Sequence, residues 1–533
     1  MKKVNLNFHP LEPRDLGYSI LVFVLSFALY IRTLVPTLLY GDSGEFQTLF
    51  YSVGMTHPTG YPVFVLLGKL FTLLPVGALT WRANLYIAFQ GALTISCIYI
   101  LVRMLIGWRV AGIYAGFVLA INPLFWFYAV VAELYIPACL LTALIFILML
   151  QWRQKNQLRY LLMAGMLGGL SLGVHSTVAL LAPAILVYLF ISNANKKAWM
   201  AAVAGGLIGL LLFAGSFLFI DRLNADAGYY NATVEHSLST WQMTEADFDS
   251  PIERFSFLYF GKQFQYQMFA NPKTVMAENG DGLLYIFREV FVPFSIPLGL
   301  FGLLYLLARH WREGILILLA AAAQLLFALN YEVYDYYVFF IPAFVFISVC
   351  SAVGVAAILD GISILITSDA LKKKKVFTYI PGSVGIFIFL ATVYSAYPMI
   401  SDAWQEKNVT FIRDTQLDEY PYPIDTPDAP HQRAIKVVDA LEENAILFTD
   451  WDMLFPYYFV AHVEEQNIGM DFHETYPQDD EDGLSLSIMI YIQDNLDRPI
   501  YFSQRPNDDN SSRLILRPVK KGNIMLYQVE GMK

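Results

Sequence analysis

Long apolar runs separated by short polar connections dominate the first 397 residues of this chain. A helix needs roughly 20 mostly apolar residues to cross the hydrocarbon core of a bilayer. The pattern therefore predicts a polytopic α-helical membrane domain with about eleven transmembrane helices. The predicted spans cover residues 16–35, 83–106, 110–128, 134–151, 159–175, 177–192, 198–220, 285–307, 314–330, 335–359 and 376–397.

One further apolar run, Val63 to Thr80, is interrupted by Lys69 and Pro75. A span at this point would invert the sidedness of every later loop, so we predict a juxtamembrane or half-inserted helix instead. The first outer loop is then expected over residues 36–82.

Basic residues occupy alternate connections between the predicted spans. Lys and Arg collect on the cytoplasmic side of membrane proteins, and all five clusters fall on the side of the N-terminus. We therefore predict an N-in, C-out topology, with a long outer loop at 221–284. The clusters are Arg103 with Arg109, Arg153 with Lys155 and Arg159, Lys196 with Lys197, Arg309 with Arg312, and Lys372 to Lys375.

Residues 398–533 read as a small extracytoplasmic α/β domain that follows a transmembrane domain over 1–397. Helix-like stretches alternate with short β-type runs, and the segment 514–529 resembles a hairpin that turns at Lys521 and Gly522. Helices are predicted at 434–443, 455–465 and 484–495, and strands at 445–449 and 499–503.

Composition and charge support this division of the chain. The 533 residues are 56% hydrophobic and 15% charged, with a mean hydropathy of +0.49, which is far from the composition of soluble domains. Residues 402–533 contain 25 acids and 11 bases, which gives this part a net charge of −14. The whole chain carries −10, so residues 1–401 carry +4. The soluble part has no basic aromatic face, which argues against a nucleic-acid partner. The expected localisation is a multi-pass membrane protein, in the inner (plasma) membrane if the source is bacterial.

The most informative polar segment is YGDSGEFQTLFYSVGMTHPTGYP, residues 40–62, directly after the first predicted span. Asp42 and Glu45 lie three residues apart, which places them on one face of a helix. Acids at a bilayer boundary are costly to desolvate and usually mark a functional site. A carboxylate there could act as a general base toward an acceptor hydroxyl. Capping of a helix N-terminus is the simpler structural role for one of the two acids.

Three further polar residues are candidates for substrate binding. His57 could donate a hydrogen bond to a phosphate or an acceptor, or serve only as a local loop group. Glu133, in VVAELYIP, could face the same cavity as Asp42, or be a solvated loop acid. His175, in LGVHST, is more simply explained as a buried, hydrogen-bonded histidine.

Positive charge on the predicted outer side suggests a site for an anionic leaving group. A departing lipid phosphate needs cations that stabilise its developing charge. Arg254, Lys262 and Arg288 occupy or flank the long outer loop, and Arg32 lies near the outer end of the first span. Arg32 could also simply extend its side chain to the interface.

The segment LYIRTLVPTLLYGDSGEFQTLFYSVGMTHPTGYPVFVLLGKLF closely resembles the signature of a membrane family whose animal members are protein O-mannosyltransferases of the multispanning GT-C class. VVAELYIP and LGVHST look like its next two motifs, and LFTDWDMLFPYYFVAHVEE resembles a segment of its soluble region. The resemblance covers about the first 190 residues well and the remainder loosely. Many bacterial members of that family are longer and carry repeat-rich C-terminal extensions.

The resemblance implies a GT-C-like fold and a sugar donor carried on a polyprenyl phosphate. In such enzymes an acid in the first outer loop is the base for inverting transfer, a role that would fall to Asp42, with Glu45 its neighbour. Glu133 would match a second outer-loop acid used for acceptor or metal contacts. No certain cofactor is implied, although a divalent cation stays open. The implied acceptor is a protein Ser or Thr hydroxyl or a glycan.

Two other function classes are compatible with these residues. A transporter or flippase for lipid-linked sugars would use the same cavity without chemistry, but such folds often contain internal repeats, and we find no second copy of the GDSGEF segment. A membrane receptor or assembly factor would depend on the acidic outer domain and not on Asp42.

Overall fold

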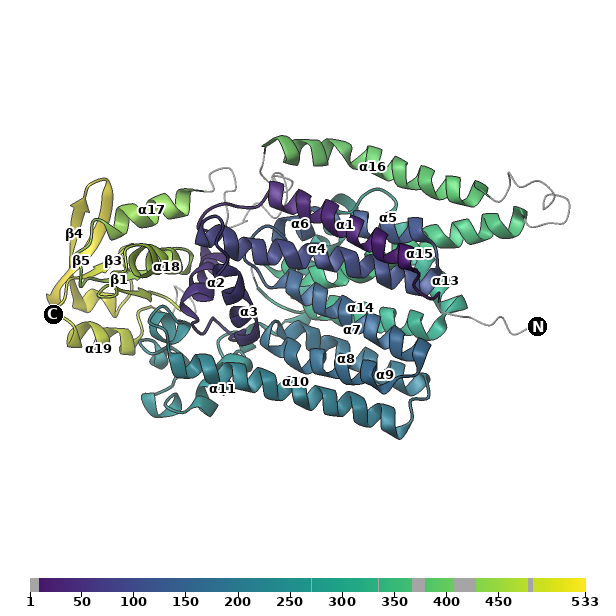
Figure 1. The fold of residues 1–533 in the computed structure, drawn as a ribbon. Coiled ribbons are helices and arrows are strands. Elements are labelled where there is room, and N and C mark those ends of the chain that lie inside the picture. The colour runs from purple at the N-terminus through teal and green to yellow at the C-terminus, as the bar shows by residue number, and fades with distance from the viewer. Residues whose placement is uncertain (1–8, 270, 334, 367–378, 407–427, 478–482) are drawn as a thin grey trace.

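A long helical bundle with a small α/β domain at one end forms the molecule (Figure 1). The computed structural model describes residues 9–269, 271–333, 335–366, 379–406, 428–477 and 483–533. The first described residues lie at the end of the bundle opposite to the C-terminal domain (Figure 1). Helices α2 (Gly41–Ser52) and α3 (Pro62–Thr72) lie between the bundle and that domain.

Seven described helices are long and apolar enough to cross a membrane, and five shorter apolar helices accompany them. The seven begin at Pro13, Leu79, Tyr135, Lys196, Trp311, Tyr336 and Ile380. The bundle helices are α1 (Pro13–Arg32), α4 (Leu79–Ile106), α5 (Arg109–Ala120), α6 (Pro123–Tyr128), α7 (Tyr135–Lys155), α8 (Leu158–Leu170), α9 (Ala182–Ile191), α10 (Lys196–Leu223), α13 (Ser295–Arg309), α14 (Trp311–Ala328), α15 (Ile341–Ile366) and α16 (Ile380–Glu406).

Each of the eleven predicted segments overlaps at least one of these helices, and the predicted half-inserted segment overlaps the short helix α3. The differences are local. The segment 110–128 breaks after Ala120, because Asn122 caps a new helix by accepting a hydrogen bond from the Phe125 N–H at 3.1 Å. Helix α16 continues to Glu406, past the predicted domain boundary at 397/398. The number of true membrane crossings stays a prediction.

The outer faces of several bundle helices are apolar, as contact with lipid requires. Large hydrophobic side chains are exposed on α1, α10 and α16, which lie at the periphery of the bundle in Figure 1. Inside, α8 and α10 pack closely through Gly165, Gly169, Gly205 and Gly209, where a side chain would collide with backbone of the facing helix. Small residues at such contacts are typical of helix packing in membranes.

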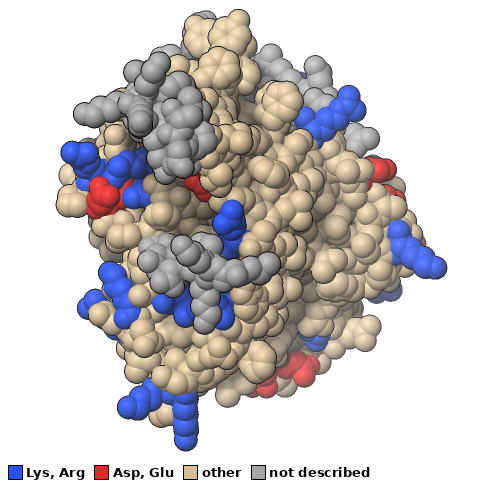
Figure 2. Space-filling view, turned by 90° about the vertical axis from the view of Figure 1, so that its right-hand side faces the viewer, with Lys and Arg blue, Asp and Glu red and all other residues tan. Residues whose placement is uncertain are grey.

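The end of the bundle far from the C-terminal domain carries Lys and Arg side chains and few acids (Figure 2). The helix ends that meet there bear four of the five predicted basic clusters; the fifth, residues 372–375, lies outside the described residues. At the same end Asp15, at the start of α1, is bound by Arg103 and Arg109 at 2.9 and 2.8 Å. Which side of the membrane this end faces stays a prediction.

The C-terminal domain is built on a five-stranded sheet in the order β2-β1-β3-β5-β4. Strand β1 pairs in parallel with both β2 and β3, and β5 pairs antiparallel with β3 and β4. The strands are β1 (Ile446–Thr449), β2 (Asp471–Glu474), β3 (Ile500–Phe502), β4 (Leu514–Lys521) and β5 (Ile524–Met532), and the helices are α17 (Ala429–Val438), α18 (Trp451–Tyr458) and α19 (Leu486–Asp494).

The sequence anticipated this domain except for β2. The four residues DFHE alternate too briefly to give a strand signal, and the strand exists because its backbone pairs with β1. The predicted hairpin turn at Lys521 and Gly522 lies between β4 and β5, where Gly522 adopts a φ of 62°.

Candidate functional site

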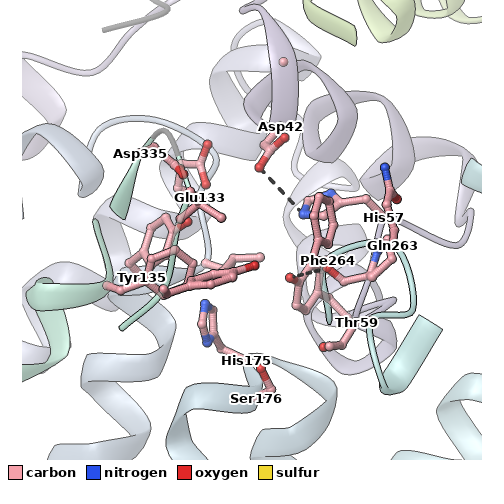
Figure 3. A pocket seen from close by; sticks show the side chains of 18 of the residues that line it. Asp42, His57, Thr59, Glu133, Tyr135, His175, Ser176, Gln263, Phe264 and Asp335 are labelled. Carbon is pink, nitrogen blue, oxygen red and sulfur yellow. Dashed lines mark hydrogen bonds and ion pairs between the residues drawn. The ribbon is translucent and has the colours of Figure 1, made fainter. Parts of the chain in front are cut away.

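A cavity of about 420 Å³ lies where the bundle, the long loop after α10 and the C-terminal domain meet. Figure 3 shows Asp42 pointing into it from α2, with Glu133 and Asp335 on one side and His57 on the other. The lining includes polar groups from all three parts of the chain: Asp42, His57, Glu133, His175, Gln263, Asp335, Asp452 and Glu474, with aromatic rings such as Tyr61, Tyr135, Phe264, Phe339 and Trp451.

Asp42 is held by two neighbours and remains partly open to the cavity. Its Oδ1 accepts a hydrogen bond from Trp451 Nε1 at 2.8 Å, and its Oδ2 lies 3.6 Å from His57 Nε2. About a third of the side chain is exposed (32%). Tyr40, not Asp42, is the N-cap residue of α2. The simple capping role therefore does not describe Asp42, whose carboxylate contacts side chains at the cavity.

Glu45 lies one turn along α2 and is completely buried behind His57. Its two oxygens accept hydrogen bonds from His57, one from the backbone N–H at 2.8 Å and one from Nδ1 at 2.5 Å. Asp42 and Glu45, which lie on one face of α2, therefore both lie next to the imidazole of His57, as their spacing predicts. Glu45 itself does not line the cavity.

This buried cluster controls the charge of His57. Burial lowers the pKa of His57, but the charges of Glu45 and Asp42 outweigh it and raise the pKa to about 9. Burial likewise raises the pKa of Glu45, and the imidazolium opposes that shift. The imidazolium of His57 therefore lies between the buried carboxyl group of Glu45 and the carboxyl group of Asp42, which faces the cavity.

Glu133 and Asp335 form an acidic wall near Asp42 (Figure 3). Glu133 is buried and accepts a hydrogen bond from Ser43 Oγ at 3.0 Å. Burial and then the charge of Asp42 raise the pKa of Glu133 well above its ordinary value, and the same causes raise the pKa of Asp335 to about 7. Burial thus favours the protonated form of both groups, which lie near the Asp42 carboxyl group that accepts a hydrogen bond from Trp451.

His175 lines the cavity but is engaged locally. Its Nδ1 accepts a hydrogen bond from the Thr177 N–H at 3.1 Å and lies 2.6 Å from Thr177 Oγ1. Its ring stacks on Tyr61 with an angle of 20° between the planes. This arrangement matches the buried, hydrogen-bonded histidine that the sequence favoured.

None of the four cations predicted for the leaving group lines this cavity. Arg254 forms a two-point ion pair with Asp221 at 2.7 and 2.8 Å, at the end of α10. Lys262 is exposed, although its neighbours Gly261 and Gln263 belong to the lining. Arg32 ends α1 and Arg288 lies exposed after α12 (Pro272–Tyr285). Among the described lining residues there is no Lys or Arg, so His57 is the cationic group.

Several lining residues were missed at the sequence level. Asp335 stands in a Tyr-rich run that reads as an interfacial belt, although a lone acid at the start of a span is itself a signal. Trp451 lies in the segment LFTDWDMLFPYYFVAHVEE, whose resemblance to the family's soluble region assigned no role to single residues. Glu474, at the end of the unpredicted β2, accepts a hydrogen bond from Thr233 Oγ1 at 3.0 Å, and burial raises its pKa to about 8.

The His, Asp and Glu side chains that the structure describes around the cavity do not form a ready metal centre. Within the described residues, no three His, Cys, Asp or Glu side chains are grouped closely enough to hold a metal ion. The acids nearest Asp42 also have raised pKa values, which disfavours the ionised form that a hard cation needs. The divalent cation left open by the sequence stays untested.

Comparison with known proteins agrees with the motifs. The family model described as the Protein O-mannosyl-transferase TMEM260 N-terminal domain matches residues 42–199. The Mus musculus protein O-mannosyl-transferase TMEM260 is 37% identical over 118 residues, 22% of this chain and 17% of that protein. The Dictyostelium discoideum protein is 26% identical over 131 residues, 24% and 16% of the two chains. The matches thus cover less than a fifth of the length of these curated relatives.

Two solved structures share the fold over almost the whole chain. ArnT from Cupriavidus metallidurans, bound to undecaprenyl phosphate, superposes with a TM-score of 0.56 over 97% of this chain and 98% of that one, at 13% identity. The Archaeoglobus fulgidus oligosaccharyltransferase, tethered to an acceptor peptide, gives a TM-score of 0.50 over 96% and 74%, also at 13% identity. At this identity the likeness concerns the fold alone.

These comparisons confirm the resemblance to the GT-C O-mannosyltransferase-like family and the GT-C-like fold. With the apolar helices, they identify a multi-pass integral membrane protein. Sidedness is not tested by them, and neither is the role of any single residue.

Proposed function

We propose that this chain is a membrane glycosyltransferase that moves a sugar from a polyprenyl-phosphate donor to an acceptor hydroxyl, with Asp42 as the general base. The observation that carries the proposal is the position of Asp42, a partly exposed carboxylate held by two side chains at the wall of a cavity. A general base must accept a proton while it is fixed in place, and this carboxylate meets both needs.

The proposed reaction is a single displacement. The acceptor O–H donates to the free edge of the Asp42 carboxylate, and its oxygen attacks the anomeric carbon of the sugar. The new C–O bond forms as the bond from that carbon to the phosphate oxygen breaks, and the electron pair leaves with the lipid phosphate. The proton ends on Asp42, and the configuration of the sugar inverts.

The other lining groups support distinct parts of this reaction. The imidazolium of His57 stabilises the adjacent carboxylate and keeps one of its oxygens oriented. Protonated carboxyl groups at Glu133 and Asp335 would donate hydrogen bonds to sugar hydroxyls. Of the four cations predicted to hold the leaving phosphate, Lys262 is best situated, because both of its chain neighbours line the cavity.

The nature of the substrates is inferred from the comparisons. The ArnT structure contains undecaprenyl phosphate, and the oligosaccharyltransferase structure contains an acceptor peptide. The two curated relatives are named protein O-mannosyl-transferases. We therefore propose a lipid-linked mannose as donor and a protein Ser or Thr as acceptor, on the extracytoplasmic side.

The direct test uses the purified full-length protein in detergent or nanodiscs. Polyprenyl-phosphate mannose with a labelled sugar is incubated with Ser- or Thr-containing peptides, and label in peptide is measured by mass spectrometry. Transfer, or slow donor hydrolysis without peptide, supports the proposal. A flippase would move the donor across vesicle bilayers and leave it intact, and a receptor would do neither.

A further inference from the structure

The C-terminal domain reaches the candidate base directly. Trp451 is the first residue of α18, and its indole N–H donates the 2.8 Å hydrogen bond to Asp42 Oδ1. The two residues lie 409 positions apart in the chain. A charge-assisted hydrogen bond of this length fixes the direction of a carboxylate as well as stabilising it.

The indole itself is held by rings on two further segments. The His57 ring meets it edge-on, with centroids 5.7 Å apart and planes at 87°, and Tyr229 of the long loop does the same at 5.9 Å and 77°. Phe455, one turn along α18, packs at 5.2 Å. Trp451 is therefore not free to change its rotamer without disturbing all three parts of the cavity wall.

The start of α18 is fixed by its own cap and by a close contact with α2. Asp450 caps α18 by accepting a hydrogen bond from the Met453 N–H at 2.9 Å. On the other side, a methyl group at Gly44 would collide with the Leu39 carbonyl and come within 3.2 Å of Pro456 Cδ. Glycine at position 44 thus permits α18 to approach α2 closely enough for the indole to reach Asp42.

We propose that Trp451 is a positioning residue for the Asp42 base, so that the active site is complete only when the C-terminal domain is docked on α2. This inference rests on the proposed function. Its physical content is that the N–H fixes Oδ1 and with it the plane of the carboxylate, so that Oδ2, 3.6 Å from His57 Nε2, keeps the orientation in which it accepts the acceptor proton. Loss of that donor leaves the base misdirected and more readily protonated, while the substrate-binding surfaces remain.

The test is Trp451→Phe in the full-length protein, with transfer from polyprenyl-phosphate mannose to a peptide as readout. Phenylalanine keeps an apolar ring but has no N–H. We expect kcat to fall about 10-fold or more, with the acceptor KM within about twofold of wild type. The acid limb of the kcat profile should also move to higher pH, because the carboxylate has lost a donor.

The matched control is Trp241→Phe in the long loop. Trp241 is buried and packs against Phe257, and within the described residues its Nε1 has no hydrogen-bond partner. This variant should keep the wild-type kcat and pH profile. A wild-type kcat and profile in Trp451→Phe would overturn the proposal, and so would an effect confined to acceptor KM.

A second measurement applies if Trp451→Phe folds poorly. Protein labelled with ¹⁵N at the indole nitrogens gives one N–H resonance for each of the nine tryptophans, and single Trp→Phe variants at the other eight positions assign the Trp451 signal by elimination. That resonance should shift in Asp42→Asn and stay in place in the surface variant Asp494→Asn. An unmoved resonance contradicts the proposal. If Asp42→Asn retains transfer, the proposed function itself fails, whereas an inactive Asp42→Asn with a normal Trp451→Phe rejects only the role of Trp451.

Discussion

The imidazole of His57 lies against the buried carboxylate of Glu45, with Nδ1 and Oε2 only 2.5 Å apart. The second ring nitrogen faces Asp42 at 3.6 Å. The segment GDSGEF therefore supplies two acids with different tasks. Glu45 favours the charged form of His57 from inside the protein, and Asp42 faces the cavity.

This relationship predicts how stability depends on pH. The pKa of His57 is about 9 in the folded protein and near 6.5 in an unfolded chain. Because the folded value is raised, the contribution of His57 to stability is complete below pH 6.5 and is lost as the pH rises through 9. We expect the free energy of unfolding of wild type to fall by up to about 3 kcal/mol across this window. The apparent Tm should fall with it.

Two variants check the cause of that pH dependence. In His57→Gln the fall between pH 6.5 and 9 should be much smaller. In Glu45→Gln the largest charge that raises the pKa of His57 is gone, so the fall should move to lower pH. Thermal unfolding in buffers of constant ionic strength measures both. Identical curves for all three proteins would contradict the assignment.

Glu133 gives a second prediction, because it should act as a neutral acid. Burial and then the charge of Asp42 raise its pKa well above the ordinary value, which favours the protonated form. Glu133→Gln keeps the size and a hydrogen-bond donor, so kcat/KM should stay within a few-fold of wild type, whereas Glu133→Ala should lose about 10-fold or more. The exposed Glu332, outside the lining, provides the control Glu332→Gln.

The same variants address metal dependence. If Glu133 were an anionic ligand to a divalent cation, Glu133→Gln would lose activity as severely as Glu133→Ala, and the wild-type enzyme would be inhibited by a chelator. That result would replace the neutral-acid role with a metal site.

We expect the ion pair between Arg254 and Asp221 to contribute to stability and not to catalysis. Asp221 is almost fully buried, and removing the guanidinium leaves that carboxylate unpaired. We expect Arg254→Gln to lower the free energy of unfolding by roughly 1–3 kcal/mol, with kcat per folded molecule unchanged. Arg254→Gln combined with Asp221→Asn should recover much of the loss. A selective fall in kcat at normal stability would restore Arg254 as a leaving-group cation.

The sequence predicts the helical part of the fold well, because membrane spans must satisfy their backbone internally and therefore appear as long apolar runs. Every predicted segment overlaps at least one helix. Strand β2 was missed because its four residues depend on pairing with β1 for their structure. Its end nevertheless supplies Glu474 to the cavity lining.

The parts of the candidate site that lie close together in the sequence were predictable. The spacing of Asp42 and Glu45, and a histidine twelve residues after Glu45, lie within one motif. Trp451 and Asp335 join the site only through tertiary packing, at sequence separations for which no local pattern exists. None of the four predicted cations lines the cavity, for a related reason: positive charge on a loop does not reveal that Arg254 already has Asp221 as a partner.

If Asp42 is the base for sugar transfer, single-turnover transfer by purified Asp42→Asn should be slow. Asparagine keeps the shape of the side chain but cannot take the proton. We expect a rate roughly 10²–10⁴-fold below wild type, with donor binding and Tm retained and with Asp494→Asn unaffected. Transfer by Asp42→Asn at the wild-type rate would contradict this role.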